Sequence, residues 1–140
     1  MKTLKQLLIR FDWVSPNITE ENFPPEKVRN TDYKLFHFDR YVSSEDVVKE
    51  MDKEGYNPAN IYELLNWKDW NSKDWVVALG SSCVLGGSRQ VAFLSRVDFG
   101  RGLVLDVWGG DWRGDWFGFA RFLGVRNLET KALESSSKEE

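Results

Sequence analysis

The sequence predicts one α+β domain: a four- or five-stranded, mainly antiparallel sheet with a helical hairpin packed on one face. Its length of 140 residues is that of a single domain with its own hydrophobic core. Apolar residues recur with the 3.6-residue period of a helix between residues 43 and 67, and with the two-residue period of a strand after residue 74. Ten of the eleven glycines, the usual turn formers, lie between residues 75 and 126.

Residues 1–31 are expected to form a short helix and an irregular arm packed on the core. Within residues 3–11 the apolar side chains have the i, i+3, i+4, i+7 spacing of an amphipathic helix. Three prolines then interrupt regular structure between residues 14 and 31. The alternating run at residues 33–38 predicts a first strand, which begins an α+β domain over residues 32–127.

Two helices joined by a turn are predicted next. Ser43 or Ser44 is a suitable N-cap for the first helix, which is expected to end at Gly55. Asn57 and Pro58 have the residue types of an N-cap and first position, so they predict the start of the second helix. Together these elements form the predicted helical hairpin.

In the remainder of the domain, apolar runs separated by turn residues predict strands near residues 75–81, 89–97, 103–108 and 119–126. The first of them is continuously apolar and is expected to be central and buried. Gly86–Gly87 predicts a tight hairpin turn. Because the connections are short, an antiparallel meander is expected. Residues 128–140 are polar and are predicted to be a disordered tail.

The counts of cysteine and histidine exclude several kinds of site. Cys83 alone cannot close an intrachain disulfide, and with His37 alone it cannot complete a four-ligand zinc site. His37 lies in a strand-like run, where a partly exposed strand residue is the simpler interpretation. We therefore expect no metal, no cofactor and no catalytic residue.

Charge and hydropathy favour a cytoplasmic protein. No apolar run approaches the roughly 20 residues of a membrane span, and the N-terminus lacks the pattern of a signal peptide. The net charge of −3 is unfavourable for binding duplex nucleic acid. The expected partner is an unknown protein or a small polar ligand, and the oligomeric state stays open.

The segment from Trp108 to Trp116 is the strongest candidate for a binding loop. Its three tryptophans recur every fourth residue among Gly, Asp and Arg, which combines stacking area with directional hydrogen bonds. The alternative is a loop that tucks these tryptophans into the core. The tentative ligand-binding residues are Trp108, Asp111, Trp112, Arg113, Asp115, Trp116 and Arg121.

These features favour a small noncatalytic binding or protein-interaction module that uses this loop. One alternative is a module that binds carbohydrate or single-stranded nucleic acid, because both ligands stack on aromatic rings. Another is a hydrolase that uses Asp106, Asp111 or Asp115, since glycoside hydrolysis needs only two carboxylates.

Residues 41–126 resemble a group of small, uncharacterised bacterial proteins of the candidate-phyla type. The resemblance rests on the Gly-Tyr-Asn-Pro-Ala run at 55–59, the Val-Ala-Leu-Gly-Ser run at 77–81, the Arg-Gly-Leu at 101–103 and the ending Arg-Phe-Leu-Gly-Val-Arg at 121–126. It implies this fold unit and its boundaries, and it implies no activity, cofactor or catalytic residue.

Overall fold

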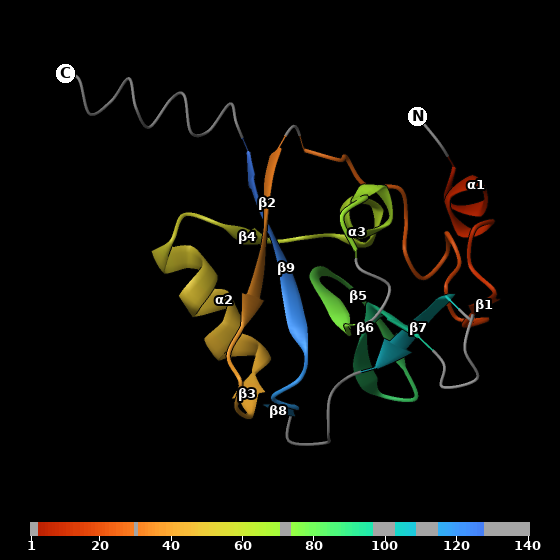
Figure 1. Cartoon of the computed structure of the whole chain (residues 1–140). Helices are drawn as coiled ribbons and strands as arrows, with labels where there is room; N and C mark the ends of the chain where they lie inside the picture. The colour runs from red at the N-terminus through yellow and green to blue at the C-terminus, as the bar shows by residue number, and fades with distance from the viewer. Residues whose placement is uncertain (1–2, 30, 71–73, 97–102, 109–114, 128–140) are drawn as a thin grey trace.

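The computed structural model describes residues 3–29, 31–70, 74–96, 103–108 and 115–127, which contain three helices and nine strands (Figure 1). The helices are α1 (Leu4–Leu8), α2 (Ser44–Lys53) and α3 (Ile61–Asn66). The strands are β1 (Trp13–Val14), β2 (Thr31–His37), β3 (Val42–Ser43), β4 (Asn57–Pro58), β5 (Val76–Leu85), β6 (Ser88–Arg96), β7 (Leu103–Trp108), β8 (Asp115–Trp116) and β9 (Arg121–Asn127).

The main sheet has the strand order β1-β7-β6-β5-β9-β2, and the short strand β4 also pairs with β9. Strands β3 and β8 form a separate two-stranded sheet. The five long strands of the main sheet match the expected number. The sheet is mixed rather than mainly antiparallel, because β9 runs parallel to β5 and β1 runs parallel to β7.

The expected meander includes β5, β6 and β7 but does not continue into β9. Strand β9 lies between β5 and β2, where Phe122 pairs with Val77 and also with Phe36. The first residues of β5, Val76–Ala78, have no exposed area, so this strand has to be covered on both faces and paired on both edges. Strand β6 fills one edge and β9 fills the other.

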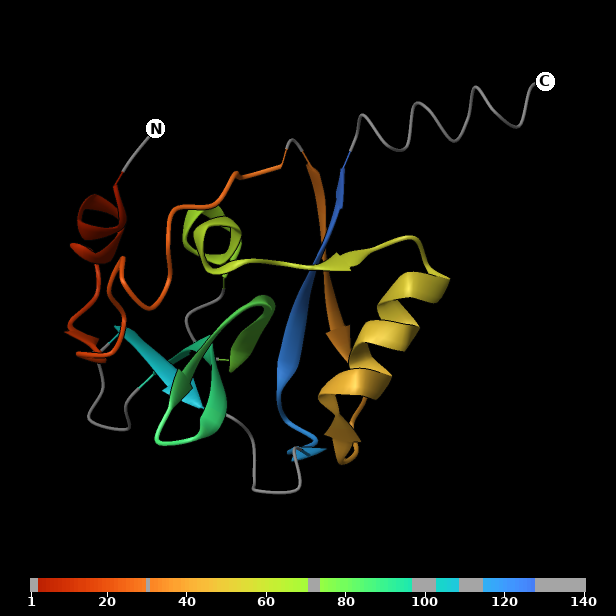
Figure 2. The same ribbon diagram turned by 180° about the vertical axis from the view of Figure 1, so that it is seen from behind.

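The two main helices do not form the expected hairpin on one face. In both views α2 lies on one side of the β2–β9 pair and α3 lies on the other (Figures 1 and 2). Helix α2 begins and ends as predicted, with Ser43 as its N-cap and Gly55 at a φ of +80°. Residues 57–58 are extended as β4 because a proline disfavours helical backbone in the residue before it. Helix α3 therefore starts later, capped by Asn60.

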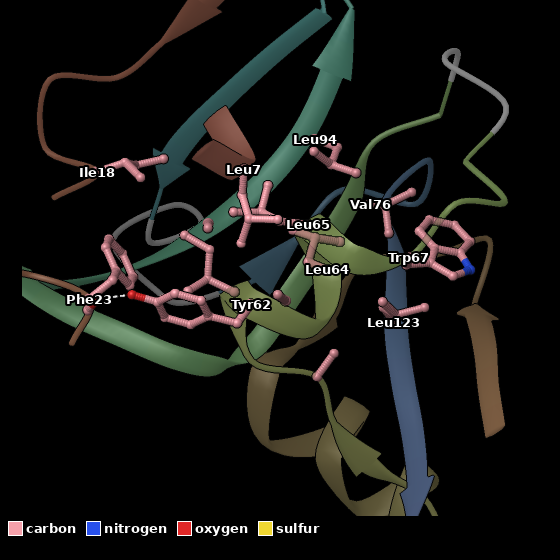
Figure 3. Close-up of a cluster of buried hydrophobic side chains, with 14 of the residues drawn as sticks. Leu7, Ile18, Phe23, Tyr62, Leu64, Leu65, Trp67, Val76, Leu94 and Leu123 are labelled. Carbon is pink, nitrogen blue, oxygen red and sulfur yellow. Dashed lines mark hydrogen bonds between the residues drawn. The ribbon is translucent and has the colours of Figure 1, made fainter. Parts of the chain in front are cut away.

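One core cluster lies on the α3 side of the sheet (Figure 3). Helix α3 contributes residues such as Leu64 and Leu65, and the sheet contributes Leu94 and Leu123. The N-terminal arm covers this cluster with five buried apolar side chains: Leu4, Leu7, Phe11, Ile18 and Phe23. The Tyr62 hydroxyl donates a hydrogen bond of 2.7 Å to the Phe23 carbonyl, which fixes the arm to α3.

A second core cluster lies on the α2 side. Val47 and Met51 of α2 are completely buried, and they share this cluster with Phe93 of β6 and Phe122 of β9. The sheet is thus covered on both faces by different helices. The face covered by α2 carries the candidate functional surfaces described next.

Candidate functional site

The structure describes only part of the predicted Trp108–Trp116 loop. Asp111, Trp112 and Arg113 lie outside the described residues. Trp108 is the last residue of β7 and pairs with Val91, and Asp115 in β8 pairs with Ser43. The two described ends of the loop therefore belong to different sheets.

Trp116 is part of the core, which agrees with the alternative of a loop that tucks its tryptophans inward and not with a ligand contact at this residue. Only 1% of its surface is exposed. Its ring packs edge-on against Phe122 with a centroid distance of 5.7 Å, and its indole Nε1–H donates a 2.8 Å hydrogen bond to the Ser44 hydroxyl. This indole consequently ties β8 to the first turn of α2 and offers no face to a ligand.

Replacing Trp116 with phenylalanine is expected to lower the free energy of unfolding by about 2 kcal/mol. The smaller ring leaves unfilled volume in the core, and the hydrogen bond to Ser44 is lost. Urea denaturation followed by circular dichroism measures the change. The matched control is Trp13→Phe, because Trp13 is 47% exposed and should tolerate the same substitution with little effect. Equal losses in the two variants would contradict the structural role of Trp116.

Arg121 also has a structural contact. Its guanidinium forms a 3.1 Å ion pair with Asp74, and its backbone N–H donates to the Trp75 carbonyl at 2.9 Å. These contacts anchor the start of β9 beside the start of β5. The Arg121 side chain is 29% exposed, so it borders the surface.

A group of aromatic side chains that sequence reasoning did not single out lies beside Trp116. Tyr41 and Phe119 are 63% and 51% exposed, and Phe117 is half-buried between them. Trp75 packs edge-on against Phe119 at 5.2 Å and stacks on Phe93 at 4.4 Å. We call Tyr41, Phe117, Phe119 and Trp75 the aromatic strip. Its sequence signal is the Phe-Gly-Phe at 117–119 directly after the tryptophan loop.

A tight turn positions the strip. The Ala120 N–H donates to the Phe117 carbonyl at 3.0 Å, so residues 117–120 reverse the chain and place the Phe117 and Phe119 rings 5.4 Å apart. Glycine suits position 118 because a Cβ atom there would lie 3.0 Å from the Arg40 backbone nitrogen, which is closer than an ordinary contact. The His37 Nε2 lies 2.8 Å from the Gly118 carbonyl, which further holds the turn against the end of β2.

The carboxylates and the cysteine of the described residues are placed apart from one another. Asp106 and Asp115, two carboxylates considered for hydrolysis, lie on strands of different sheets. Across the described ranges, no three His, Cys, Asp or Glu side chains converge to hold a metal ion. Burial raises the pKa of the Cys83 thiol, so this cysteine is a weak nucleophile.

Comparisons with known proteins add no functional assignment. No protein-family model matches the chain, and neither the curated proteins nor the solved structures give a significant match. The resemblance to small bacterial proteins thus stays a prediction. Of the helices in the described residues, none combines the length and apolar character that crossing a membrane requires.

Proposed function

We propose that this chain is a noncatalytic protein-interaction module that binds its partner through the aromatic strip. The observation that carries the proposal is the exposure of Tyr41 and Phe119 at one continuous set of aromatic contacts. Grouped apolar side chains at a protein surface mark interaction sites, whereas single exposed ones do not. Aromatic side chains are also the residues that most often dominate the binding energy of interfaces.

The ring geometry favours a protein partner over a sugar or a nucleic acid base. The Phe117 and Phe119 rings are parallel within 6° with their centroids 5.4 Å apart, so each covers part of one face of the other. Tyr41 is tilted by 59° from Phe117, and Trp75 is nearly perpendicular to Phe119. Flat ligands stack best on open, similarly oriented ring faces. An uneven aromatic surface instead suits the aliphatic or proline side chains of a folded protein or peptide.

The charges near the strip support the same choice. Arg40 and Asp39 are both exposed and adjacent, and the Arg121 cation is paired with Asp74. Single-stranded nucleic acid binding requires a positively charged groove along the backbone. The described residues around the strip carry a balanced charge, in a chain whose net charge is −3. The Trp108–Trp116 loop adjoins the strip in sequence, and we include its residues 111–113 in the proposed contact surface of this cytoplasmic module.

Selection from a displayed library of random 12-residue peptides tests this proposal. We expect enriched peptides to be rich in aliphatic, proline or aromatic residues and to bind with dissociation constants in the micromolar range. The Tyr41→Ser/Phe119→Ser double variant should weaken their binding at least tenfold, because both side chains are exposed and contribute contact area. The matched control is Val84→Ser, which removes an equally exposed apolar side chain from the β5–β6 hairpin and should leave binding unchanged.

Two results would overturn the proposal. One is a set of enriched peptides that bind the double variant as tightly as the original protein. The other is that the original protein binds oligosaccharides or oligodeoxythymidine saturably and the double variant does not. That result would show that the strip binds a ligand that stacks on aromatic rings.

A further inference from the structure

A separate cavity lies between the first half of α2 and the β5–β6 hairpin. Its volume is about 410 Å³, which falls in the range of roughly 300–1,000 Å³ typical of small-molecule sites. Helix α2 contributes one wall through Val48, and the sheet contributes the other through Leu79 and Val91. None of the aromatic-strip residues lines it, so it is a second candidate site.

The apolar walls follow from the way α2 packs on the sheet. Val47 and Met51 are completely buried between α2 and the strands, whereas Val48, on the adjoining edge of the helix, remains 39% exposed. Leu79 and Val91 lie on the sheet face that carries the α2-side core, next to Val77 and Phe93 in their strands. Where α2 does not reach across this face, an apolar hollow remains.

The charged groups at the rim determine which ligand fits. Arg89 comes from the hairpin, and Glu45 and Lys49 come from α2. Glu45 and Lys49 are four residues apart on the helix, and no ion pair joins them in the described structure. Within the described part of the chain, the Arg89 side chain forms no ion pair or hydrogen bond, whereas its backbone pairs with Val84 of β5. The two positive charges of Arg89 and Lys49 at the rim therefore exceed the one negative charge of Glu45, which leaves a net charge of +1.

Two hydroxyl groups complete the polar edge. Ser44 and Ser82 line the cavity on the helix side and the sheet side. Ser44 is held in place because its hydroxyl accepts the indole hydrogen bond of Trp116. It retains a hydroxyl hydrogen that can be donated to an anionic oxygen.

We propose that this cavity binds a small amphipathic monocarboxylate, with its apolar body on Val48, Leu79 and Val91 and its carboxylate at Arg89. The body supplies the free energy of burial, and the guanidinium selects the anion through a charge-assisted hydrogen bond. A neutral ligand of the same shape leaves the Arg89 charge unused. A dianion carries more negative charge than the net charge of +1 that Arg89, Lys49 and Glu45 give the rim. A medium-length aliphatic chain with one carboxylate matches both the apolar walls of the cavity and the charge at its rim.

Titration of the ¹⁵N-labelled full chain with octanoate tests the site by nuclear magnetic resonance. We expect saturable shifts of the Val48, Leu79 and Val91 amides, with a dissociation constant of about 1 mM or lower. Arg89→Gln should weaken octanoate binding about fivefold, and Arg40→Gln, the removal of an exposed arginine outside the cavity, should not. Octan-1-ol should bind at least fivefold more weakly than octanoate, and butyrate should produce no saturable shifts.

The proposal fails if octanoate shifts no cavity amide in a saturable way. It also fails if octan-1-ol binds as tightly as octanoate, or if Arg40→Gln weakens binding as much as Arg89→Gln. Because both arginines are exposed, neither substitution should disturb the fold, and the unchanged spectrum of each free variant verifies this. Binding of octanoate by the Tyr41→Ser/Phe119→Ser variant, at an unaltered affinity, separates this site from the aromatic strip.

Discussion

Replacing Gly80 with alanine is expected to lower the free energy of unfolding by about 3 kcal/mol, near the upper end of the usual cost of overpacking. The added Cβ atom would lie 2.5 Å from the Pro58 carbonyl oxygen and 2.6 Å from the Ala59 carbonyl oxygen. Both obstacles are backbone atoms, so no side-chain rotation can relieve the contact. Urea denaturation followed by circular dichroism measures the loss.

The close approach at Gly80 joins β5 to the entrance of α3. The Gly80 N–H donates to the Ala59 carbonyl at 2.7 Å, and the next residue, Ser81, accepts a 2.8 Å hydrogen bond from the Ile61 N–H. The Ser81 hydroxyl also donates to the Glu26 carboxylate at 2.6 Å. A displacement of residues 58–61 by the alanine therefore disturbs the helix start and the arm together.

Ser82→Ala is the matched control for Gly80→Ala, because it changes an exposed side chain two positions along the same strand. It should change the free energy of unfolding by no more than about 0.5 kcal/mol. A Gly80→Ala protein as stable as the Ser82→Ala protein would contradict the close packing of β5 against residues 58–59.

The sequence predicts the local elements of this fold better than their arrangement. The cap of α2, its end at Gly55 and the turn at Gly86–Gly87 depend on residues that act locally, and all three occur as expected. The position of β9 between β5 and β2 depends on contacts between residues that are far apart in sequence. The extended backbone at Asn57–Pro58 likewise combines a local preference of proline with the pairing to β9. A pattern of apolar residues does not specify which strands pair with β9.

The candidate site shows the same division. Composition singled out the Trp108–Trp116 segment as aromatic, but it could not distinguish a buried indole from an exposed one. Trp116 is buried because β8 pairs with β3 and places the indole beside Ser44. The exposed aromatic residues instead follow it, at a turn that Gly118 allows to pass Arg40. The cavity between α2 and the β5–β6 hairpin was not predictable, because its apolar walls come from Val48 and from strand residues more than 30 positions later in the sequence.

Replacing Glu63 with glutamine is expected to lower the free energy of unfolding by about 3 kcal/mol. The Glu63 side chain is completely buried, and its carboxylate accepts four hydrogen bonds. Three come from Arg29, through its backbone N–H, its Nε and its Nη2, and the fourth comes from the backbone N–H of Asn60. The hydrogen bond to this carboxylate also raises the pKa of the Arg29 guanidinium.

The glutamine amide cannot reproduce this arrangement in either orientation. Each carboxylate oxygen receives two donors, so an amide NH₂ group at either position faces donors instead of acceptors. The loss should stay near the lower end of the 3–5 kcal/mol typical of a broken buried pair, because the Arg29 side chain is 26% exposed and regains some hydration. Hydrogen exchange should also show faster exchange at Arg29 and Asn60, the two backbone donors.

Glu50→Gln provides the matched control, since it makes the same chemical change in an exposed pair with Lys53 on α2. Exposed pairs of this kind contribute little, so this variant should stay within about 0.5 kcal/mol of the original protein. High salt should change the loss of unfolding free energy caused by Glu63→Gln very little, because buried charges are weakly screened. A Glu63→Gln protein that unfolds at the same urea concentration as Glu50→Gln would show that Arg29 and Glu63 do not hold the arm to α3. The expected difference in unfolding free energy between the two variants thus measures how strongly the buried Glu63 carboxylate holds the arm to α3.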